Sequence, residues 1–181
     1  TSEKKSNKIL KNLYSPLISK GAKYINTSRR AAELIKYASN AFLATKITFI
    51  NELANLCEKL DIDVEDVSIG IGTDNRIGSR FLRAGPAYGG SCFPKDTRAL
   101  IYTAKKSKSP LSIINTVINS NNKRSHLLLT RIAKILKNKI KNKKITFLGV
   151  TFKANTDDMR ESASLKMIPF LNKKGAIINY Y

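Results

Sequence analysis

The chain has 181 residues, 42% of them hydrophobic and 8% aromatic, which is enough to bury a core and excludes a disordered composition. Its formal net charge of +20 favours an anionic partner. The lysines are spread along the whole chain, and no aromatic residue interleaves the densest run, residues 134–144, so we do not expect nucleic acid to be the main partner.

The sequence also limits the compartment and the kinds of site. No window reaches the roughly 18 continuous apolar residues of a membrane span. The first residues are polar and basic, without the apolar core of a signal peptide. Cys57 and Cys92 are too few for a disulfide framework, and a single histidine, His126, argues against a zinc site. We expect a cytoplasmic protein with no membrane span and no bound metal.

Hydrophobic periodicity predicts the elements of the first half. Ser28 is a candidate cap for a long helix that is apolar nearly all round, so this helix is expected to be buried or to form an interface. Glycine is then frequent between residues 70 and 90, as in loops that carry chemistry. The predicted elements are a helix over 3–18, a short strand over 22–26, the long helix over 29–60 and a short helix over 64–71.

Two prolines and a lysine-rich run divide the second half. Pro94 suits the first turn of one helix, and Pro110 lies near the start of another. The predicted elements are helices from 94 and over 110–137, a linker over 137–144, a buried strand over 143–150, a helix over 162–173 and a strand over 175–181. A strand, a helix and a second strand cannot bury their own faces, so we expect this last domain to be cut at Tyr181.

The most informative segment is GPAYGGSCFPKD, residues 85–96. Its two consecutive glycines allow a ligand to approach the backbone closely. Cys92 follows directly before a predicted helix N-terminus, and both that terminus and Lys95 favour its thiolate, a nucleophile toward carbonyl carbon. Asp96 is a candidate to orient a water or to act as a base. The residues alone favour a plainer alternative, a small buried cysteine beside a glycine turn.

A second candidate pair lies on the long predicted helix. Lys36 and Asn40 are four residues apart and therefore share one helix face. Polar groups on an apolar helix are costly unless they are paired or exposed, and an ammonium and an amide that converge could hold an oxyanion. From spacing alone, an exposed lysine and an ordinary capped asparagine are the favoured interpretation.

Four segments in succession resemble the UDP-glucose 6-dehydrogenase family. Residues 32–44 (AELIKYASNAFLA) resemble its central helix, and residues 76–82 (RIGSRFL) resemble its substrate segment. Residues 89–96 (GGSCFPKD) resemble its active-site cysteine motif, and residues 145–162 (ITFLGVTFKANTDDMRES) resemble the beginning of its third, nucleotide-binding domain. The segments occur in the family's order across residues 27–181.

The resemblance implies a two-step, NAD-dependent oxidation of UDP-glucose to UDP-glucuronate. Cys92 would attack the sugar aldehyde, and water would release the uronate from the resulting thioester. Lys36 and Asn40 would stabilise the oxyanions, while Asp96 would assist proton transfer or position the water. The implied substrate residues are Arg76, acting across a homodimer interface, with Phe81, Arg83, Tyr88 and Gly89. The implied residues near the cofactor or the nucleotide diphosphate are Lys95, Lys153 and Arg160.

The family's fold is α/β and mostly helical. The resemblance implies a central all-helical dimerisation domain over 28–140, built on a long core helix. Partial Rossmann-like pieces would flank it, a remnant of the NAD-binding domain over 1–27 and the start of a UDP-binding domain over 141–181. The dinucleotide loop GxGxxG is not found, because Gly70-Ile71-Gly72 follows a helix and Asn75 stands where the last glycine belongs. We therefore expect the main NAD-binding domain to be absent and the chain alone to be inactive.

Some residues depart from the family pattern or lie outside it. Ala87 replaces a usual glycine, which matters if that position needs a positive φ, and Ala154 replaces a common proline. Cys57 is expected in the core and His126 on a solvated helix surface. Three alternatives stay open: a GDP-mannose or UDP-N-acetylmannosamine dehydrogenase fragment, a non-catalytic dimerisation remnant of a split gene, and a basic nucleic-acid-binding protein. RIGSRFL together with SCFPKD favours the UDP-glucose group.

Overall fold

The computed structural model describes residues 3–181, and its contacts divide the chain into two units, Thr1–Ser39 and Asn40–Tyr181. The first unit opens with two helices, α1 (Lys4–Leu13) and α2 (Ser15–Ile18), where the sequence predicts one. The break has a physical cause at Pro16, which has no N–H to donate to the carbonyl four residues earlier. The Ser15 hydroxyl donates to that carbonyl, Asn12 O, at 2.7 Å instead.

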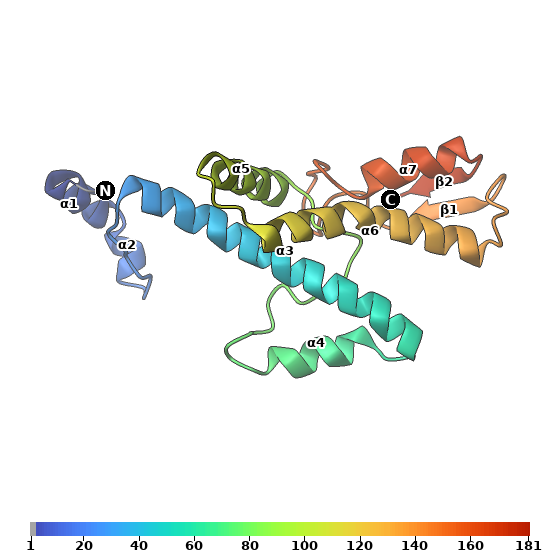
Figure 1. Cartoon of the computed structure of the whole chain (residues 1–181), viewed down its shortest axis with the longest axis horizontal. Helices are drawn as coiled ribbons and strands as arrows, with labels where there is room; N and C mark the ends of the chain where they lie inside the picture. The colour runs from blue at the N-terminus through green and yellow to red at the C-terminus, as the bar shows by residue number, and fades with distance from the viewer. Residues whose placement is uncertain (1–2) are drawn as a thin grey trace. The chain divides into compact units, whose positions relative to one another are not determined.

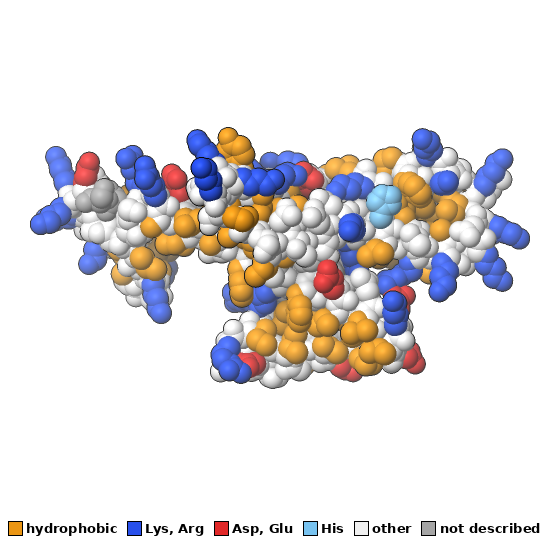
Figure 2. All heavy atoms as spheres, in the orientation of Figure 1, with side chains coloured by type: hydrophobic (Ala, Val, Ile, Leu, Met, Phe, Trp, Pro, Cys, Tyr) orange, Lys and Arg blue, Asp and Glu red, His pale blue; other side chains and the backbone are white. Residues whose placement is uncertain are grey.

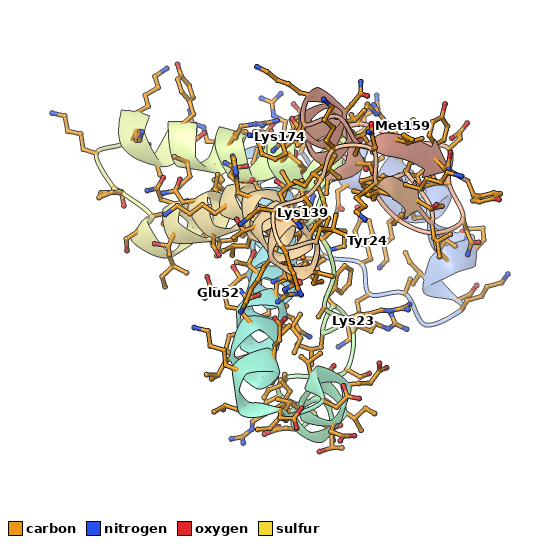
Figure 3. The ribbon with its side chains drawn as sticks, turned by 90° about the vertical axis from the view of Figure 1, so that its right-hand side faces the viewer. Lys23, Tyr24, Glu52, Lys139, Met159 and Lys174 are labelled. Atoms are coloured by element: carbon orange, nitrogen blue, oxygen red, sulfur yellow. The ribbon has the colours of Figure 1, made fainter. Side chains whose placement is uncertain are left out.

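The predicted strand over residues 22–26 is wrong, because these residues form no regular element. A strand is stabilised by ladder hydrogen bonds to a neighbour, and the described residues 3–39 include no second strand. The segment is held by a side chain instead, since the Tyr24 hydroxyl donates to Asn7 Oδ1 of α1 at 2.7 Å. Tyr24 is labelled in Figure 3.

The long helix is confirmed as α3 (Arg29–Leu60), which begins in the first unit and continues into the second. As predicted, Ser28 caps it, with its hydroxyl accepting from Ala31 N–H at 3.2 Å. Within the second unit its buried face carries small and polar residues as well as Ile50. Several large apolar side chains stay exposed, among them Phe42 at 66%.

The second unit is helical apart from a small sheet (Figure 1). As predicted, a short helix follows α3, with Asp63 accepting from Glu65 N–H at its N-cap. The glycine run 70–72 lies at the end of this helix and not in a strand-to-helix turn. The remaining elements are α4 (Val64–Gly72), α5 (Cys92–Lys106), α6 (Ser112–Ile135), β1 (Lys144–Phe147), α7 (Ser164–Lys173) and β2 (Ile177–Tyr180).

The sheet and two helices share one hydrophobic core. β1 and β2 are parallel, with Lys144 paired to Ile177 and Phe147 to Tyr180. Buried residues of α6 and α7 pack against one face of the sheet, together with one buried residue just before each strand; they are Leu129, Met167 and Leu171 of the helices, Ile140 before β1 and Ala176 before β2. Figure 2 shows lysine and arginine side chains projecting around this end of the unit.

Two details of this region differ from the sequence prediction. β1 is not buried, because its residues alternate between exposed and half-buried and Leu148 beyond it is 86% exposed. Only one face of a two-stranded sheet is covered here. The lysine-rich run predicted as a linker contains a tight turn, with positive φ at Lys137 and Asn138, and Ile140 anchors it in the core.

Candidate active site around Cys92

Cys92 is the first residue of α5 and its side chain is exposed. The sequence predicts a helix beginning at Pro94, and the structure begins it two residues earlier. Proline is tolerated there because the first backbone N–H groups of a helix have no partner within it. The cysteine therefore lies inside the first turn, where the helix dipole favours a negative charge, and the Ser91 hydroxyl lies 3.7 Å from its sulfur.

One turn after Cys92, α5 carries a fully buried carboxylate. Asp96 has 0% of its surface exposed. Lys95 Nζ lies 2.6 Å from Asp96 Oδ1, and Asn40 Nδ2 of α3 donates to Oδ2 at 2.6 Å. A buried charge is tolerated only when it is paired and hydrogen-bonded, and these two groups meet that requirement. The structure thus brings together three of the predicted residues around one carboxylate.

Lys36 belongs to the first unit. Within that unit its ammonium lies 5.7 Å from the centre of the Tyr37 ring, at a distance typical of a cation–π contact. Its predicted role beside Cys92 stays a prediction.

Residues 85–91, which we call the cysteine loop, directly precede Cys92 and are fixed by polar side chains from two helices. Asn51 of α3 accepts from Gly85 N–H at 2.7 Å. Asn121 of α6 accepts from Tyr88 N–H at 2.9 Å and donates to Tyr88 O at 3.1 Å. Arg124 of α6 donates to Gly85 O and to Asn51 O, each at 3.0 Å, and also to the Asn55 side chain. Burial lowers the pKa of Arg124, whose exposed fraction is 6%.

The glycine pair 89–90 allows a close approach, and what approaches is another part of the chain. A Cβ on Gly89 would lie 2.4 Å from Glu161 O, and a Cβ on Gly90 would lie 2.8 Å from the Phe152 ring. Gly90 also has a φ of +75° and donates its N–H to Arg160 O at 2.7 Å. The pair therefore packs against residues 150–162, the segment between β1 and α7; Met159 in this segment is labelled in Figure 3.

Arg160 lies in this segment, and its carbonyl accepts from Gly90 N–H, two residues before the cysteine. Asp158 accepts from Arg160 Nε at 2.9 Å and from Nη2 at 2.8 Å. The side-chain hydrogen bond from Arg160 lowers the pKa of Asp158 to about 2, with a smaller contribution from Arg160 N–H. The same hydrogen bond raises the pKa of Arg160, and the negative charge of Cys92 adds a smaller effect in the same direction.

A cavity of about 450 Å³ adjoins the cysteine loop. Its walls include Gly90, Ser91, Arg98, Arg160, Glu161 and Lys166. Arg98 is paired with Glu161, which leaves a net positive wall of Arg160 and Lys166. Two such cations and the backbone of a glycine turn are suited to a phosphate or diphosphate group. Among the described residues, 3–181, no group of three His, Cys, Asp or Glu side chains could hold a metal ion.

The predicted substrate residues lie before and inside the cysteine loop. Tyr88 is buried, its ring centre lies 6.0 Å from that of Phe93, and burial raises the pKa of its phenol. Phe81 has a φ of +67°, and its ring centre lies 6.1 Å from that of Phe93. Arg83 is exposed, and so is Arg76, whose guanidinium is held at 2.6 Å by Asp74. Hydrogen bonding to Asp74 raises the pKa of Arg76.

Two stretches of the chain match one known family. Residues 30–123 match the central domain of the UDP-glucose/GDP-mannose dehydrogenase family, and residues 146–181 match that family's UDP binding domain. The chain belongs to the UDP-glucose/GDP-mannose dehydrogenase family. This confirms the resemblance that the sequence motifs carry, and with it the mostly helical fold class.

Relatives in this dehydrogenase family align over nearly all of the chain. UDP-glucose 6-dehydrogenase of Rhizobium meliloti (strain 1021) is 46% identical over 180 residues, which are 99% of this chain and 41% of that protein. The Rickettsia bellii enzyme is 48% identical over 178 residues, 98% of this chain and 41% of that protein. A solved UDP-glucose dehydrogenase from Pyrobaculum islandicum superposes with a TM-score of 0.92 at 34% identity, covering 99% of this chain and 40% of that chain. The chain spans about two fifths of the length of the curated relatives that it matches.

The departures from the dehydrogenase pattern fit the local backbone. Ala87 is not among the residues with positive φ, so an alanine is accommodated where the family usually has glycine. Ala154 is exposed and also has no positive φ, whereas Asn155 after it does, at 59°. Cys57 is 5% exposed and lies in the core, as expected. His126 is exposed on α6, and its ring makes an edge contact with Phe170.

Sequence reasoning missed the residues of α6 that position the cysteine loop. Asn121 and Arg124 lie three residues apart on α6, and Val117 and Leu129 on the same helix are buried. A polar pair on the apolar face of a helix is costly unless it is hydrogen-bonded. This pattern was the available signal, but nothing in the local sequence identifies the partners. They lie 33 to 39 residues away in residues 85–88, and 69 to 73 residues away in α3.

Proposed function

We propose that this chain is the nucleophile-bearing part of a NAD-dependent UDP-glucose 6-dehydrogenase, which oxidises UDP-glucose to UDP-glucuronate. The observation that carries the proposal is the arrangement on α5. An exposed cysteine in the first turn precedes, by one turn, a fully buried aspartate held by Lys95 and Asn40. We assign residues 28–140 to a central catalytic and dimerisation domain, 141–181 to the start of a UDP-binding domain and 1–27 to the end of a NAD-binding domain. The two family matches, over 30–123 and 146–181, support the first two assignments.

The chemistry of the second oxidation follows from the thiol. The Cys92 thiolate forms a bond to the aldehyde carbon of the sugar, and the carbonyl electron pair moves to oxygen. The Asn40 amide has two N–H groups, of which one reaches Asp96, and we assign the other to this oxyanion. The same role is assigned to the Lys36 ammonium on the strength of the family resemblance. Loss of hydride from the same carbon leaves a thioester. Water attacks the thioester, the carbon–sulfur bond breaks, and Asp96 accepts or passes on the proton.

NAD, when bound, accepts hydride in both oxidation steps. The cations around the cavity beside Cys92 fit its diphosphate by charge, and we assign Arg160 to that contact. Lys153, whose ammonium lies 5.3 Å from the Phe152 ring centre, and Lys95 are assigned to the same region. Arg76, Phe81, Arg83, Tyr88 and Gly89 are assigned to the UDP-sugar.

The test of the nucleophile uses the two cysteines as a matched pair. Iodoacetamide should label Cys92 at least roughly tenfold faster than Cys57, because a buried thiol reacts only when the structure opens locally. UDP-glucose should slow the labelling of Cys92 and leave that of Cys57 unchanged. The rates are read by peptide mass spectrometry. Faster labelling of Cys57, or no protection of Cys92 by UDP-glucose, would contradict the proposal.

The same assay separates the nucleotide-sugar alternatives. GDP-mannose and UDP-N-acetylmannosamine are added in place of UDP-glucose at equal concentrations. Protection by GDP-mannose alone would assign the chain to the GDP-mannose branch of the family. The chain has no GxGxxG loop, so we expect it to form no NADH from UDP-glucose by itself. Sustained NADH formation by the isolated chain would contradict the proposal that this chain lacks the main NAD-binding site.

We further propose that α3 pairs with a second copy of the chain. Phe42, Phe49 and Leu56 are seven residues apart and are 66%, 50% and 50% exposed. Residues at this spacing form one stripe along a helix, and large exposed apolar stripes mark protein interfaces. Figure 2 shows further hydrophobic side chains gathered over α4 and the end of α3. Light scattering should give a dimer that Phe49→Asp converts to a monomer, whereas Tyr102→Asp, on α5 at a position that is 69% exposed, leaves it intact.

A further inference from the structure

Residues 150–162 form a closed loop that packs against the cysteine loop. Phe152 N–H donates to Asp158 O at 3.1 Å, and the Ser162 hydroxyl donates to Val150 O at 2.7 Å. These two hydrogen bonds hold the segment as one body between β1 and α7. We call residues 150–162 the bracing segment.

Most contacts between the bracing segment and the cysteine loop involve the backbone. Gly90 N–H donates to Arg160 O, the Glu161 carbonyl lies against Gly89, and the Phe152 ring covers Gly90. Side chains add one ion pair, in which Arg98 Nη2 of α5 lies 2.9 Å from Glu161 Oε1. Glu161 itself has a φ of 55°, a conformation that is unfavourable for a residue with a Cβ and that its surroundings must hold in place.

The bracing segment also carries a cation at the cysteine loop. Arg160 precedes Glu161 directly, its carbonyl accepts from Gly90 N–H at 2.7 Å, and Arg160 lines the same cavity as Ser91, the neighbour of Cys92. In agreement with this placement, the pKa of Arg160 is raised chiefly by hydrogen bonding to Asp158 and to a smaller extent by the charge of Cys92. Arg98 lies on the helix that begins with Cys92. The ion pair between Arg98 and Glu161 therefore connects α5, which begins with Cys92, to the residue directly after Arg160.

We infer that Arg98 and Glu161 are a positioning pair that fastens the bracing segment to α5 and thereby holds the Arg160 guanidinium beside the Cys92 thiolate. The inference rests on the proposed role of Cys92 as the nucleophile. Neither Arg98 nor Glu161 is required to touch the substrate. Their effect passes through Arg160.

The charges themselves provide a way to separate positioning from direct electrostatics. The charged groups around the cysteine loop are Arg160 and Asp158 on the bracing segment, the Lys95–Asp96 pair on α5, Arg98 with Glu161, and Lys166 of α7 on the cavity wall. If Arg98 and Glu161 acted only through space, removing the cation would disfavour the thiolate and removing the carboxylate would favour it. If they position Arg160, both changes disfavour the thiolate.

The experiment measures the iodoacetamide labelling rate of Cys92 against pH in the full 181-residue chain. The variants are Arg98→Leu, Glu161→Gln, Arg98→Lys and the exchanged pair Arg98→Glu with Glu161→Arg. Both single neutral variants should move the midpoint of the profile to higher pH and slow labelling at neutral pH by about threefold, the size expected for a partly exposed ion pair. Arg98→Lys and the exchanged pair should restore most of the rate.

Labelling of Cys57 in the same samples reports whether each variant stays folded. Unchanged Cys92 profiles, or shifts in opposite directions for Arg98→Leu and Glu161→Gln, would refute the positioning pair. So would an exchanged pair that stays as slow as the single variants. If the parent Cys92 labels no faster than Cys57, the proposed nucleophile fails independently of the variants. The two failures are therefore distinguishable.

Discussion

Replacing Gly89 by alanine should destabilise the second unit, because the new methyl group would force the cysteine loop and residues 150–162 apart. The new Cβ would lie 2.4 Å from Glu161 O, 3.0 Å from Glu161 C and 3.2 Å from Phe152 Cβ. Two of these atoms belong to the backbone and the third is bound to it, so none can rotate away. Gly89 is not among the glycines with positive φ, and the cost therefore comes from the contact and not from the dihedral angle.

The magnitude follows from two contributions. Overpacking costs about 1–3 kcal/mol, and the shift would also break the hydrogen bond from Gly90 N–H to Arg160 O, worth about 1 kcal/mol. We expect a loss of about 3 kcal/mol in the free energy of unfolding, which is about 10 °C in melting temperature for a chain of this size. Urea unfolding followed by circular dichroism measures it, since the chain is mostly helical and has no tryptophan.

The matched control is Gly85→Ala in the same loop. A Cβ there meets nothing within 4 Å, and Gly85 also has no positive φ. It should change the free energy of unfolding by less than about 0.5 kcal/mol. If Gly89→Ala unfolds at the same urea concentration as Gly85→Ala, residues 150–162 do not pack on the cysteine loop, and the argument for the bracing segment fails with it.

Three further changes test the site. Asp96→Ala should cost about 3 kcal/mol in urea unfolding, because it leaves the Asn40 amide without the acceptor that it uses at 2.6 Å; a loss below about 1 kcal/mol would contradict the buried pairing. Arg124→Lys keeps the charge but cannot reach Gly85 O and Asn51 O together, so a loss of about 2 kcal/mol is expected, against almost none for the exposed Lys123→Arg. Arg160→Gln should lower stability fully above about pH 4 and progressively less below it. The pKa of Asp158 is about 2 in the folded chain against an ordinary 3.8, so the stabilisation is present above 3.8 and is lost as the pH falls through 2. Urea titrations of parent and variant between pH 2 and 7 should converge toward the acid end, and a gap as large at pH 2 as at pH 7 would count against this cause.

The sequence predicts the elements whose signals are local. The 32-residue helix α3 follows from its apolar periodicity and its serine cap, and α4 and α7 lie within two residues of their predicted bounds. The prediction fails where a partner decides the outcome. Residues 22–26 have strand composition but no neighbouring strand among residues 3–39, and β1 has strand composition but too small a sheet to be buried.

The same distinction applies to the site. Local chemistry identifies Cys92 and Asp96 as candidates, and the family resemblance implies the roles that we propose for them. Local chemistry does not reveal that Asp96 is held by Asn40, 56 residues earlier, or that Arg124 fixes a backbone 39 residues before it. Tertiary packing determines which residues become partners. The sequence shows only that a polar residue lies on an otherwise buried helix face and must therefore have a hydrogen-bond partner.

The glycine-rich loop shows how far local reasoning extends. The glycine content of residues 85–90 predicts a backbone that can adopt unusual dihedral angles or allow close contacts, but it does not predict which glycine serves which purpose. In the structure, the reason for a glycine differs from one position to the next. Gly90 has a positive φ, Gly89 needs clearance from Glu161, and the backbone at Ala87 has no positive φ and so tolerates a methyl group. Because the atoms that exclude a side chain at Gly89 lie about 70 residues further along the chain, the need for glycine at this position comes from the contact between the cysteine loop and residues 150–162. A glycine beside the proposed nucleophile can therefore serve the assembly of the site without touching the substrate.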